Sequence, residues 1–465
     1  MGFYKKLRGL AIALVIVTMI TACSDPVIPL VAPPPEPTPI QTLATAPEPI
    51  PGEETSEPQE RGTTETTIRI AVIADGPNES FNDGESISVW QSVEAWAESL
   101  NRSTKLAGRE IIVERVNSAI FRHVEAIDFV CEGDFFAIVG SFAINDADGL
   151  ERLLSQDCSL PDFPANVFSL KRLYSGVTFQ SNPIGAITTN AGWATYFVET
   201  AQASSQKAAT LLPELTSTVL GGERLIESAT AKGFKFIHSP IYEIESDFSK
   251  ETEDLIESNS QSLVWGNSGS QLTRFLNTVI EYDPEFSFEF ISCGQPCYNP
   301  DWVQEVGPLG QGISIWLPHL PIEEAELNDE LLRYLFFMNL THGTDAKPTA
   351  AGIAAWSSAL LFEEAVSRAV GTGSAAYRPE SLTRQSVIEA ANSITFWDAA
   401  GLHGISNPAE GIPSPCFVIM TLNDGLWERT SPQRPGELNC EDENLAVLEA
   451  TADLETIEGN SRSPE

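Results

Sequence analysis

The chain has 465 residues, of which 42% are hydrophobic and 20% charged, so it is long enough to form two lobes with sizeable cores. Its formal net charge is −38, from 65 acidic and 27 basic residues. Binding of duplex nucleic acid requires a cationic surface that displaces counterions from phosphates, so this balance excludes a nucleic-acid partner.

The first 23 residues are typical of an export signal. Three basic residues between positions 5 and 8 precede an apolar run over 10–20, which is too short to span a bilayer comfortably. The run ends in Ile20-Thr21-Ala22-Cys23, which resembles a bacterial lipobox, in which the cysteine thiol receives a diacylglyceryl group. We therefore expect an exported protein, held by lipid on Cys23 at the outer face of the cell membrane or on the periplasmic side. The alternative is an ordinary signal peptide with an incidental Cys23.

Two segments have compositions that do not favour a packed core. Residues 24–66 hold eleven prolines among Thr, Glu and Ala, which predicts an extended, disordered linker between the anchor and the folded body. Residues 441–465 form an acidic tail. A short helix around 445–454 and a loose tail are both compatible with its sequence.

Between these segments, short apolar strands alternate with helices of amphipathic spacing. The first set has strands at 68–74, 110–116, 135–139 and 167–170, with helices at 87–100, 119–131 and 146–155. The second set has helices at 192–203, 219–231, 250–257 and 271–282, with strands at 208–212, 234–238, 262–266 and 286–291. A strand at 312–317, helices at 322–340, 349–370 and 380–394, and a hairpin at 416–427 follow. This order predicts an α/β fold of two doubly wound, Rossmann-like lobes with parallel sheets.

Six cysteines remain when Cys23 is set aside, an even number in an oxidising compartment. Proximity in sequence favours the pairs Cys131–Cys158, Cys293–Cys297 and Cys416–Cys440. The alternative is a metal cluster, but Cys293-Gly-Gln-Pro-Cys297 has no second cysteine pair and no histidine near it. We therefore expect three disulfides and no metal.

Several segments together resemble the branched-chain amino-acid branch of the type I periplasmic binding proteins. They are Ile68-Arg-Ile-Ala-Val-Ile-Ala-Asp-Gly-Pro77, Leu106-Ala-Gly-Arg-Glu-Ile-Ile-Val-Glu114, Phe136-Ala-Ile-Val-Gly-Ser141 and the closing hairpin, and the resemblance spans roughly 67–430. It implies a three-crossing hinge, with 67–188 and 318–412 in lobe 1, and 189–317 and 413–440 in lobe 2. It also implies a solute receptor that docks on the permease of an ABC importer.

The loop Gly140-Ser141-Phe142-Ala143 follows a strand and precedes a helix, so its backbone N–H groups and the Ser141 hydroxyl are suited to an anion. The resemblance implies that Ser141, Phe142 and Ala143, together with Ser169, hold a ligand carboxylate. The alternative is a simple strand-to-helix turn with an N-cap. Asp75 ends the first strand and is equally compatible with a loop cap and with a ligand contact.

Four further residues complete the expected ligand site. Asn267 and Ser268 follow a strand of the second set, where the resemblance implies a ligand contact. Gln295 stands where leucine-binding members carry an acid for the ligand ammonium. Trp90 either caps the cleft or packs in the core of its helix.

Catalysis is not expected. The five histidines have no metal-binding spacing, and Gly266-Asn-Ser-Gly-Ser270 lacks the last glycine of a nucleophile elbow. The sequence predicts no catalytic residue, metal or cofactor, and favours a receptor for a small polar solute such as an amino acid, an amide or a short peptide. Two alternatives stay open: a lipoprotein that uses this fold for protein contact, as a sensor partner or cell-wall-synthesis regulator, and a hydrolase whose nucleophile is Ser268.

Overall fold

The computed structural model describes residues 60–76 and 85–451. The expected signal peptide, Cys23 and most of the expected linker lie outside these residues, as does the end of the acidic tail. None of the helices in the described ranges is both long and apolar enough to cross a bilayer.

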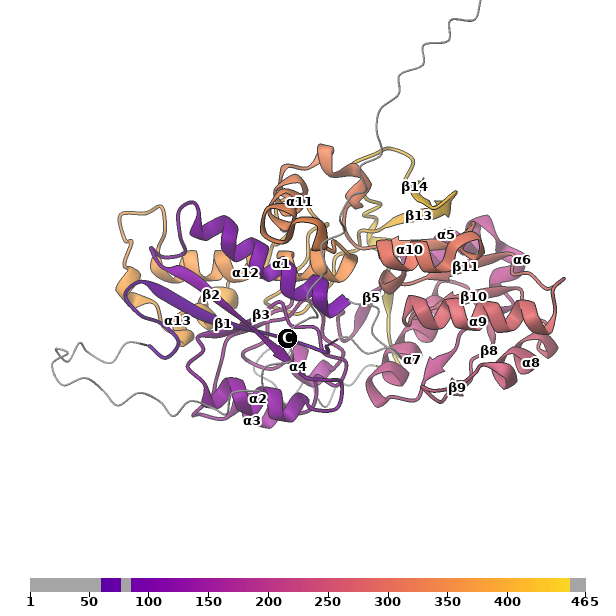
Figure 1. The fold of residues 1–465 in the computed structure, drawn as a ribbon, viewed down its shortest axis with the longest axis horizontal. Coiled ribbons are helices and arrows are strands. Elements are labelled where there is room, and N and C mark those ends of the chain that lie inside the picture. Colours follow the sequence, from indigo (N-terminus) through magenta and orange to yellow (C-terminus); the bar gives the residue numbers. More distant parts are fainter. Residues whose placement is uncertain (1–59, 77–84, 452–465) are drawn as a thin grey trace, which may run out of the picture. The chain divides into compact units, whose positions relative to one another are not determined.

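Lobe 1 is built on a four-stranded parallel sheet with the strand order β2-β1-β3-β4. Its strands are β1 (Thr67–Ala74), β2 (Glu110–Asn117), β3 (Ala137–Val139) and β4 (Asp162–Phe163). Ile70 to Ala74 of β1 are fully buried, because helices cover both faces of the sheet. In Figure 1, α1 and α12 lie on one side of this sheet, and α2 and α3 lie on the other. The helices of this lobe are α1 (Glu85–Asn101), α2 (His123–Glu132), α3 (Leu150–Leu154), α4 (Leu170–Leu173), α11 (Asp329–His342), α12 (Ala350–Val370) and α13 (Arg384–Ala391).

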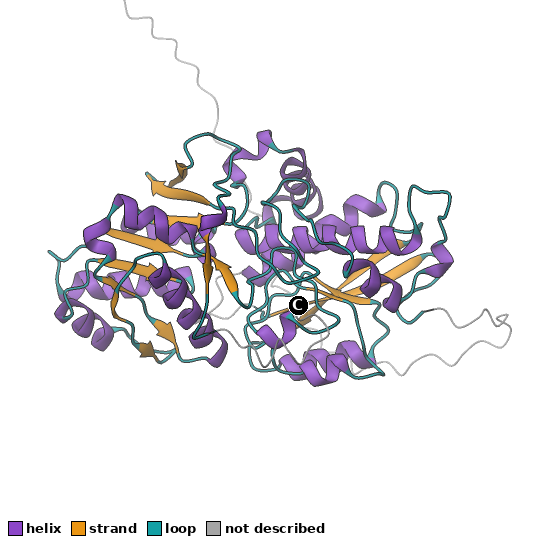
Figure 2. Ribbon diagram, turned by 180° about the vertical axis from the view of Figure 1, so that it is seen from behind, coloured by secondary structure: helices purple, strands orange, loops and turns teal. Residues whose placement is uncertain are grey.

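Lobe 2 is built on a seven-stranded sheet with the order β14-β13-β12-β11-β10-β6-β8, in which β8 to β12 pair in parallel and β13 pairs antiparallel with both β12 and β14. Figure 2 shows these strands between helices. The strands are β6 (Ala208–Ala209), β8 (Phe236–His238), β10 (Ser262–Trp265), β11 (Phe290–Cys293), β12 (Ser314–Leu317), β13 (Val418–Asn423) and β14 (Leu426–Ser431). The helices are α5 (Gly192–Thr200), α6 (Gln202–Ser205), α7 (Thr216–Ala231), α8 (Ser249–Glu257), α9 (Gly269–Tyr282) and α10 (Pro300–Val306).

Two small sheets complete the fold. A parallel pair joins β7 (Leu212–Pro213) to β9 (Ile241–Tyr242), and an antiparallel pair joins β5 (Thr188–Asn190) to β15 (Leu445–Val447). The strand β5 lies where the chain first leaves lobe 1, so β15 attaches the end of the described chain to a crossing segment.

The hydrophobic cores show how the chain divides. The core of lobe 1 takes its buried residues from 68–179 and 320–402. The two clusters of lobe 2 take nearly all of theirs from 193–317 and 417–427. The chain therefore crosses between lobes three times, and the predicted fold of two doubly wound lobes is confirmed.

Two local predictions are wrong, and a third segment differs from both of its open alternatives. Residues 167–170 form no strand: Ser169 is the N-cap of α4, and the fourth strand is the two-residue β4. Residues 445–447, for which a helix and a loose tail were both left open, form β15, because their backbone pairs with β5. The folded body begins at about residue 60 and not at 67, because the guanidinium of Arg61 donates to the carbonyls of Cys131 and Gly133.

The structure joins the six cysteines in the three pairs that proximity favours, Cys131–Cys158, Cys293–Cys297 and Cys416–Cys440. The second pair closes a short loop directly after β11. The third ties the last crossing segment to the chain that leads to β15.

Candidate functional site

A cavity of about 320 Å³ lies between the two lobes. Its walls are loops that follow the carboxyl ends of strands in both sheets, which is where open α/β sheets bind ligands. These loops contribute Asp75 after β1, Phe142 after β3, Ala165 after β4, Asn267 after β10, Gln295 after β11 and Pro318 after β12.

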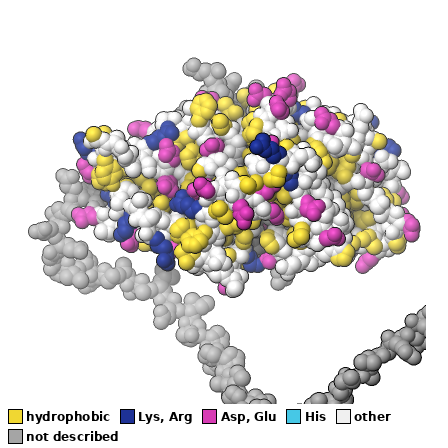
Figure 3. Space-filling view, turned by 90° about the horizontal axis from the view of Figure 1, so that it is seen from above, with side chains coloured by type: hydrophobic (Ala, Val, Ile, Leu, Met, Phe, Trp, Pro, Cys, Tyr) yellow, Lys and Arg dark blue, Asp and Glu magenta, His cyan; other side chains and the backbone are white. Residues whose placement is uncertain are grey.

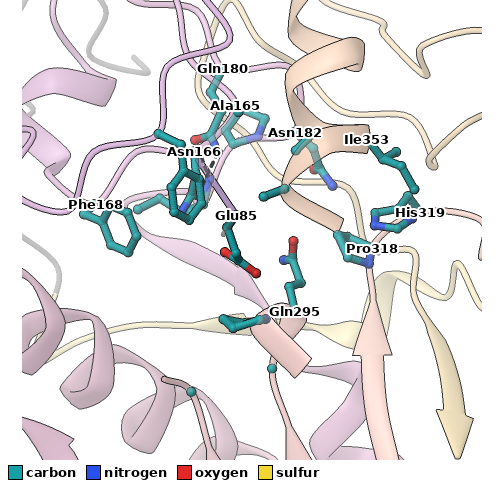
Figure 4. A pocket seen from close by; sticks show the side chains of 18 of the residues that line it. Glu85, Ala165, Asn166, Phe168, Gln180, Asn182, Gln295, Pro318, His319 and Ile353 are labelled. Atoms are coloured by element: carbon teal, nitrogen blue, oxygen red, sulfur yellow. Dashed lines mark hydrogen bonds between the residues drawn. The ribbon is translucent and has the colours of Figure 1, made fainter. Parts of the chain in front are cut away.

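Most side chains that line the cavity are apolar or carry a neutral amide or hydroxyl. The ionisable residues among the described lining are Asp75, Glu85, His319 and His403, and no lysine or arginine is included. Glu85 comes from lobe 1 and Gln295 from lobe 2, and Figure 4 shows both side chains pointing into the central space. The described lining therefore offers acidic and neutral groups but no cation.

Asp75 organises the loops of lobe 1. Its Oδ1 accepts from the Ser118 hydroxyl at 2.7 Å and from the Ile120 N–H at 2.8 Å, and its Oδ2 accepts from the Ile144 N–H at 2.7 Å. Both carboxylate oxygens are thus engaged by loop groups. Of the two sequence interpretations, a loop cap describes Asp75 better than a ligand contact.

Ser141 is fully buried behind the cavity, in a cluster of charged side chains. Its hydroxyl accepts from the guanidinium of Arg172 at 2.8 Å. Arg172 also makes a bidentate pair with Asp162, with both N···O distances at 2.9 Å, and one of its nitrogens lies 3.7 Å from Asp146. The Ser141 hydroxyl is therefore part of an internal ion-pair network.

Asp146 completes this network. Its carboxylate accepts from the Phe168 N–H at 2.8 Å. Burial raises the pKa of the Asp146 carboxyl to about 7, against the lowering effect of Arg172. The N–H that follows β4, where the resemblance implied a ligand carboxylate near Ser169, is occupied by a carboxylate of the chain itself.

The lobe 2 wall holds Asn267, Ser268 and Gln295. The Asn267 amide donates to the Leu211 carbonyl at 2.8 Å, and the Ser268 hydroxyl accepts from the Gln271 N–H at 3.4 Å as the N-cap of α9. This capping bond gives Ser268 a structural part and does not support it as a nucleophile. The Gln295 side chain lies in the loop closed by the Cys293–Cys297 disulfide and bonds to none of the described residues.

Two histidines lie where the crossing segments meet, and a backbone bridge joins His319 to His403. His319 Nδ1 lies 2.8 Å from the Leu320 carbonyl, and His403 Nδ1 lies 2.7 Å from the Gly404 carbonyl, so in both rings Nδ1 carries the proton. Burial lowers the pKa of both imidazoles, that of His319 to about 4. Both rings are therefore neutral at pH 7.

The two Nε2 atoms differ in their surroundings. His403 Nε2 lies 3.1 Å from the hydroxyls of Ser181 and Ser357, which satisfy it. His319 Nε2 is buried and has no hydrogen-bond partner among the described residues, although the side chain lines the cavity. An unprotonated Nε2 is an acceptor, so His319 carries a buried acceptor without a donor among the described residues, in a side chain that borders the cavity.

The structure brings together only some of the residues expected from the sequence. Phe142, Asn267, Ser268 and Gln295 line the cavity. The remaining four do not: Ser141, Ala143, Ser169 and Trp90. Trp90 is buried in lobe 1, where its indole N–H donates to the Val72 carbonyl at 3.0 Å.

Sequence reasoning missed Glu85, His319 and His403, together with the amides Asn166 and Gln180. His319 carried a usable signal, because it stands two residues after an apolar strand at a predicted crossing. Glu85 and His403 have no such signal, because only the packing of α1 and of the last crossing brings them to the cavity. Within the described residues, no group of three or more His, Cys, Asp or Glu side chains is placed to hold a metal ion.

Comparison with known proteins identifies this architecture. The family model described as "Periplasmic binding protein" matches residues 67–426, which is most of the chain. No curated protein sequence matches this chain significantly.

Solved structures of the same fold include three informative cases. A fatty acid ABC transporter substrate-binding protein from Thermomonospora curvata has a TM-score of 0.67 at 14% identity, over 83% of this chain and 96% of that one. A leucine-binding protein from Thermotoga maritima has a TM-score of 0.61 at 12% identity, over 78% of this chain and 97% of that one. A solute-binding protein from R. palustris in complex with benzoate has a TM-score of 0.62 at 13% identity, over 80% of this chain and 98% of that one. At these identities the likeness shows the fold alone.

Proposed function

The chain belongs to the periplasmic-binding-protein family, and from this membership we propose that it is a lipid-anchored receptor that delivers a small polar solute to the permease of an ABC importer. The observation that carries the proposal is the cavity of about 320 Å³ between the lobes, walled by loops from both sheets. Amino acids, amides and short peptides are the candidate solutes. A cleft packed with the protein's own side chains would favour the alternative of protein contact, and the space in this cleft argues against that alternative.

Solute binding is tested by thermal unfolding of the purified full-length chain in detergent, against a panel of amino acids, amino amides, amines and short peptides. A ligand present at 100 times its Kd stabilises the folded state by about 2.7 kcal/mol, so a cognate solute should raise Tm by several degrees. Isothermal titration then gives the stoichiometry, which we expect to be one solute per chain. If no member of the panel raises Tm, the receptor proposal is wrong.

The anchor is tested separately through Cys23. The wild-type chain, expressed in a bacterium fed radiolabelled fatty acid, should become labelled and sediment with the membranes. The Cys23→Ser chain should lose the label and leave the membrane fraction on washing, because one or more acyl chains supply the membrane affinity. The neighbouring Ser24→Ala chain is the matched control and should behave as wild type. Label retained by Cys23→Ser would exclude Cys23 as the lipidated residue.

A further inference from the structure

We propose that the solute of this receptor is a small organic amine, protonated at neutral pH and without a carboxylate, such as an amino amide. The inference rests on the proposed function and narrows its solute class. It rests on three observations. The described lining has no cationic side chain, several N–H groups of the lobe 1 loops already bind internal carboxylates, and Glu85 and His319 line the cavity.

Among the described residues, the cavity has no side chain with a positive charge to pair with an anion. The described lining includes no lysine or arginine, and the histidines His319 and His403 are neutral at pH 7. An isolated carboxylate that left water for this site would bear its desolvation cost without a cationic partner.

Three backbone N–H groups of the lobe 1 loops are already bound to carboxylates of the chain itself. The N–H groups of Ile120 and Ile144 donate to Asp75, and the N–H of Phe168 donates to Asp146. The Ser141 hydroxyl accepts from Arg172, whose charge is balanced by the two aspartates beside it. Two internal carboxylates thus occupy donors at the strand ends of lobe 1. The N-terminus of α9, which also borders the cavity, is capped by Ser268.

Two groups instead favour a hydrogen-bond donor with positive charge. The carboxylate of Glu85 points into the cavity from the first residue of α1 (Figure 4). His319 is 3% exposed, and its Nε2 is an acceptor that bonds to none of the described residues. A protonated amine carries one charge and several N–H donors, which suits a site that presents a carboxylate and a hydrogen-bond acceptor.

The apolar part of the wall is also suited to a cation. Phe142 and Phe168 meet edge to face, with ring centroids 5.9 Å apart and planes at 81°, and both line the cavity. The faces of aromatic rings attract ammonium groups and pack against apolar chains. Acidic side chains are also spread over the molecular face in Figure 3, and the chain carries a net charge of −38, which raises the local concentration of cations.

The test compares ligands that carry a carboxylate with related amines that do not. The pairs are leucine against leucinamide, which share the ammonium group and the side chain, and benzoate against benzylamine, which share the ring. Titration calorimetry and thermal shift on the full-length chain should show the amine of at least one pair binding at least tenfold more tightly than its carboxylate. Equal or tighter binding of the carboxylates would overturn the amine assignment while leaving the receptor intact. Binding of neutral solutes alone would do the same, and no binding by any solute would overturn both proposals.

A charge-neutral variant locates the contact. Glu85→Gln should weaken binding of the amine at least tenfold and make binding less sensitive to salt, because the paired charge is lost. Glu98→Gln, on the same helix but paired with Arg102 outside the cavity, is the matched control and should bind as wild type. Thermal unfolding of the unliganded variants distinguishes lost contact from misfolding. Unchanged binding by a folded Glu85→Gln chain would contradict the assigned contact.

Discussion

Replacing Arg172 with methionine is expected to lower the free energy of unfolding by about 3–5 kcal/mol. Arg172 is 1% exposed and holds Asp162 by two hydrogen bonds of 2.9 Å, with Asp146 close by. Removing it leaves two buried acids without their cation and leaves the Ser141 hydroxyl without its donor. Denaturant unfolding followed by circular dichroism measures the change.

The loss should also depend on pH. The nearby guanidinium lowers the pKa of Asp146, which burial raises to about 7, so the variant's Asp146 has a still higher pKa. A carboxyl whose pKa is higher in the folded state than in the unfolded state destabilises the fold as pH rises through the folded-state pKa. The free energy of unfolding of the variant should therefore lie further below that of wild type at pH 8 than at pH 6. Arg152→Met, which removes a partly exposed pair with Asp157, is the control and should cost about 1 kcal/mol or less. A loss below about 1 kcal/mol for Arg172→Met would contradict a structural part for the network.

The fold was largely predictable from the sequence, whereas the site was predictable only in part. β1 and β2 are long runs of β-branched residues, and their pattern is local. β4 has two residues between Pro161 and Pro164, so it presents no apolar run, and the nearby Val167–Leu170 stretch was the more strand-like segment. A pattern of apolar residues therefore identifies buried strands that are long enough to display it, and misses a two-residue strand such as β4.

Ser141 was an attractive anion ligand because a serine after a strand and before a helix has that geometry. Its actual partner, Arg172, lies 31 residues further along the chain, and no local pattern connects the two. Phe142, one residue later, does line the cavity, since successive residues of the loop point in different directions. The position of the binding loops thus follows from topology, whereas the chemistry they present depends on long-range partners.

Filling the cavity should have the largest effect on function. Along α12, the small side chains Ala351, Ala354 and Ser357 face the space between the lobes at intervals of three residues. Ala354→Trp places the bulkiest side chain at the middle of this row. We expect solute affinity to fall at least 100-fold, about 2.7 kcal/mol, because the indole occupies the volume that a solute needs.

The unliganded Ala354→Trp chain should keep the circular dichroism spectrum of wild type, since Ala354 is partly exposed and borders an empty space. Ala231→Trp, at the exposed end of α7, adds the same side chain away from the cavity and should leave binding unchanged. If the folded Ala354→Trp chain still bound its solute with wild-type affinity, the inter-lobe cavity could not be the binding site. A partner protein that contacts only the outer surface should bind the Ala354→Trp chain as tightly as wild type. The variant therefore also distinguishes solute binding from protein contact.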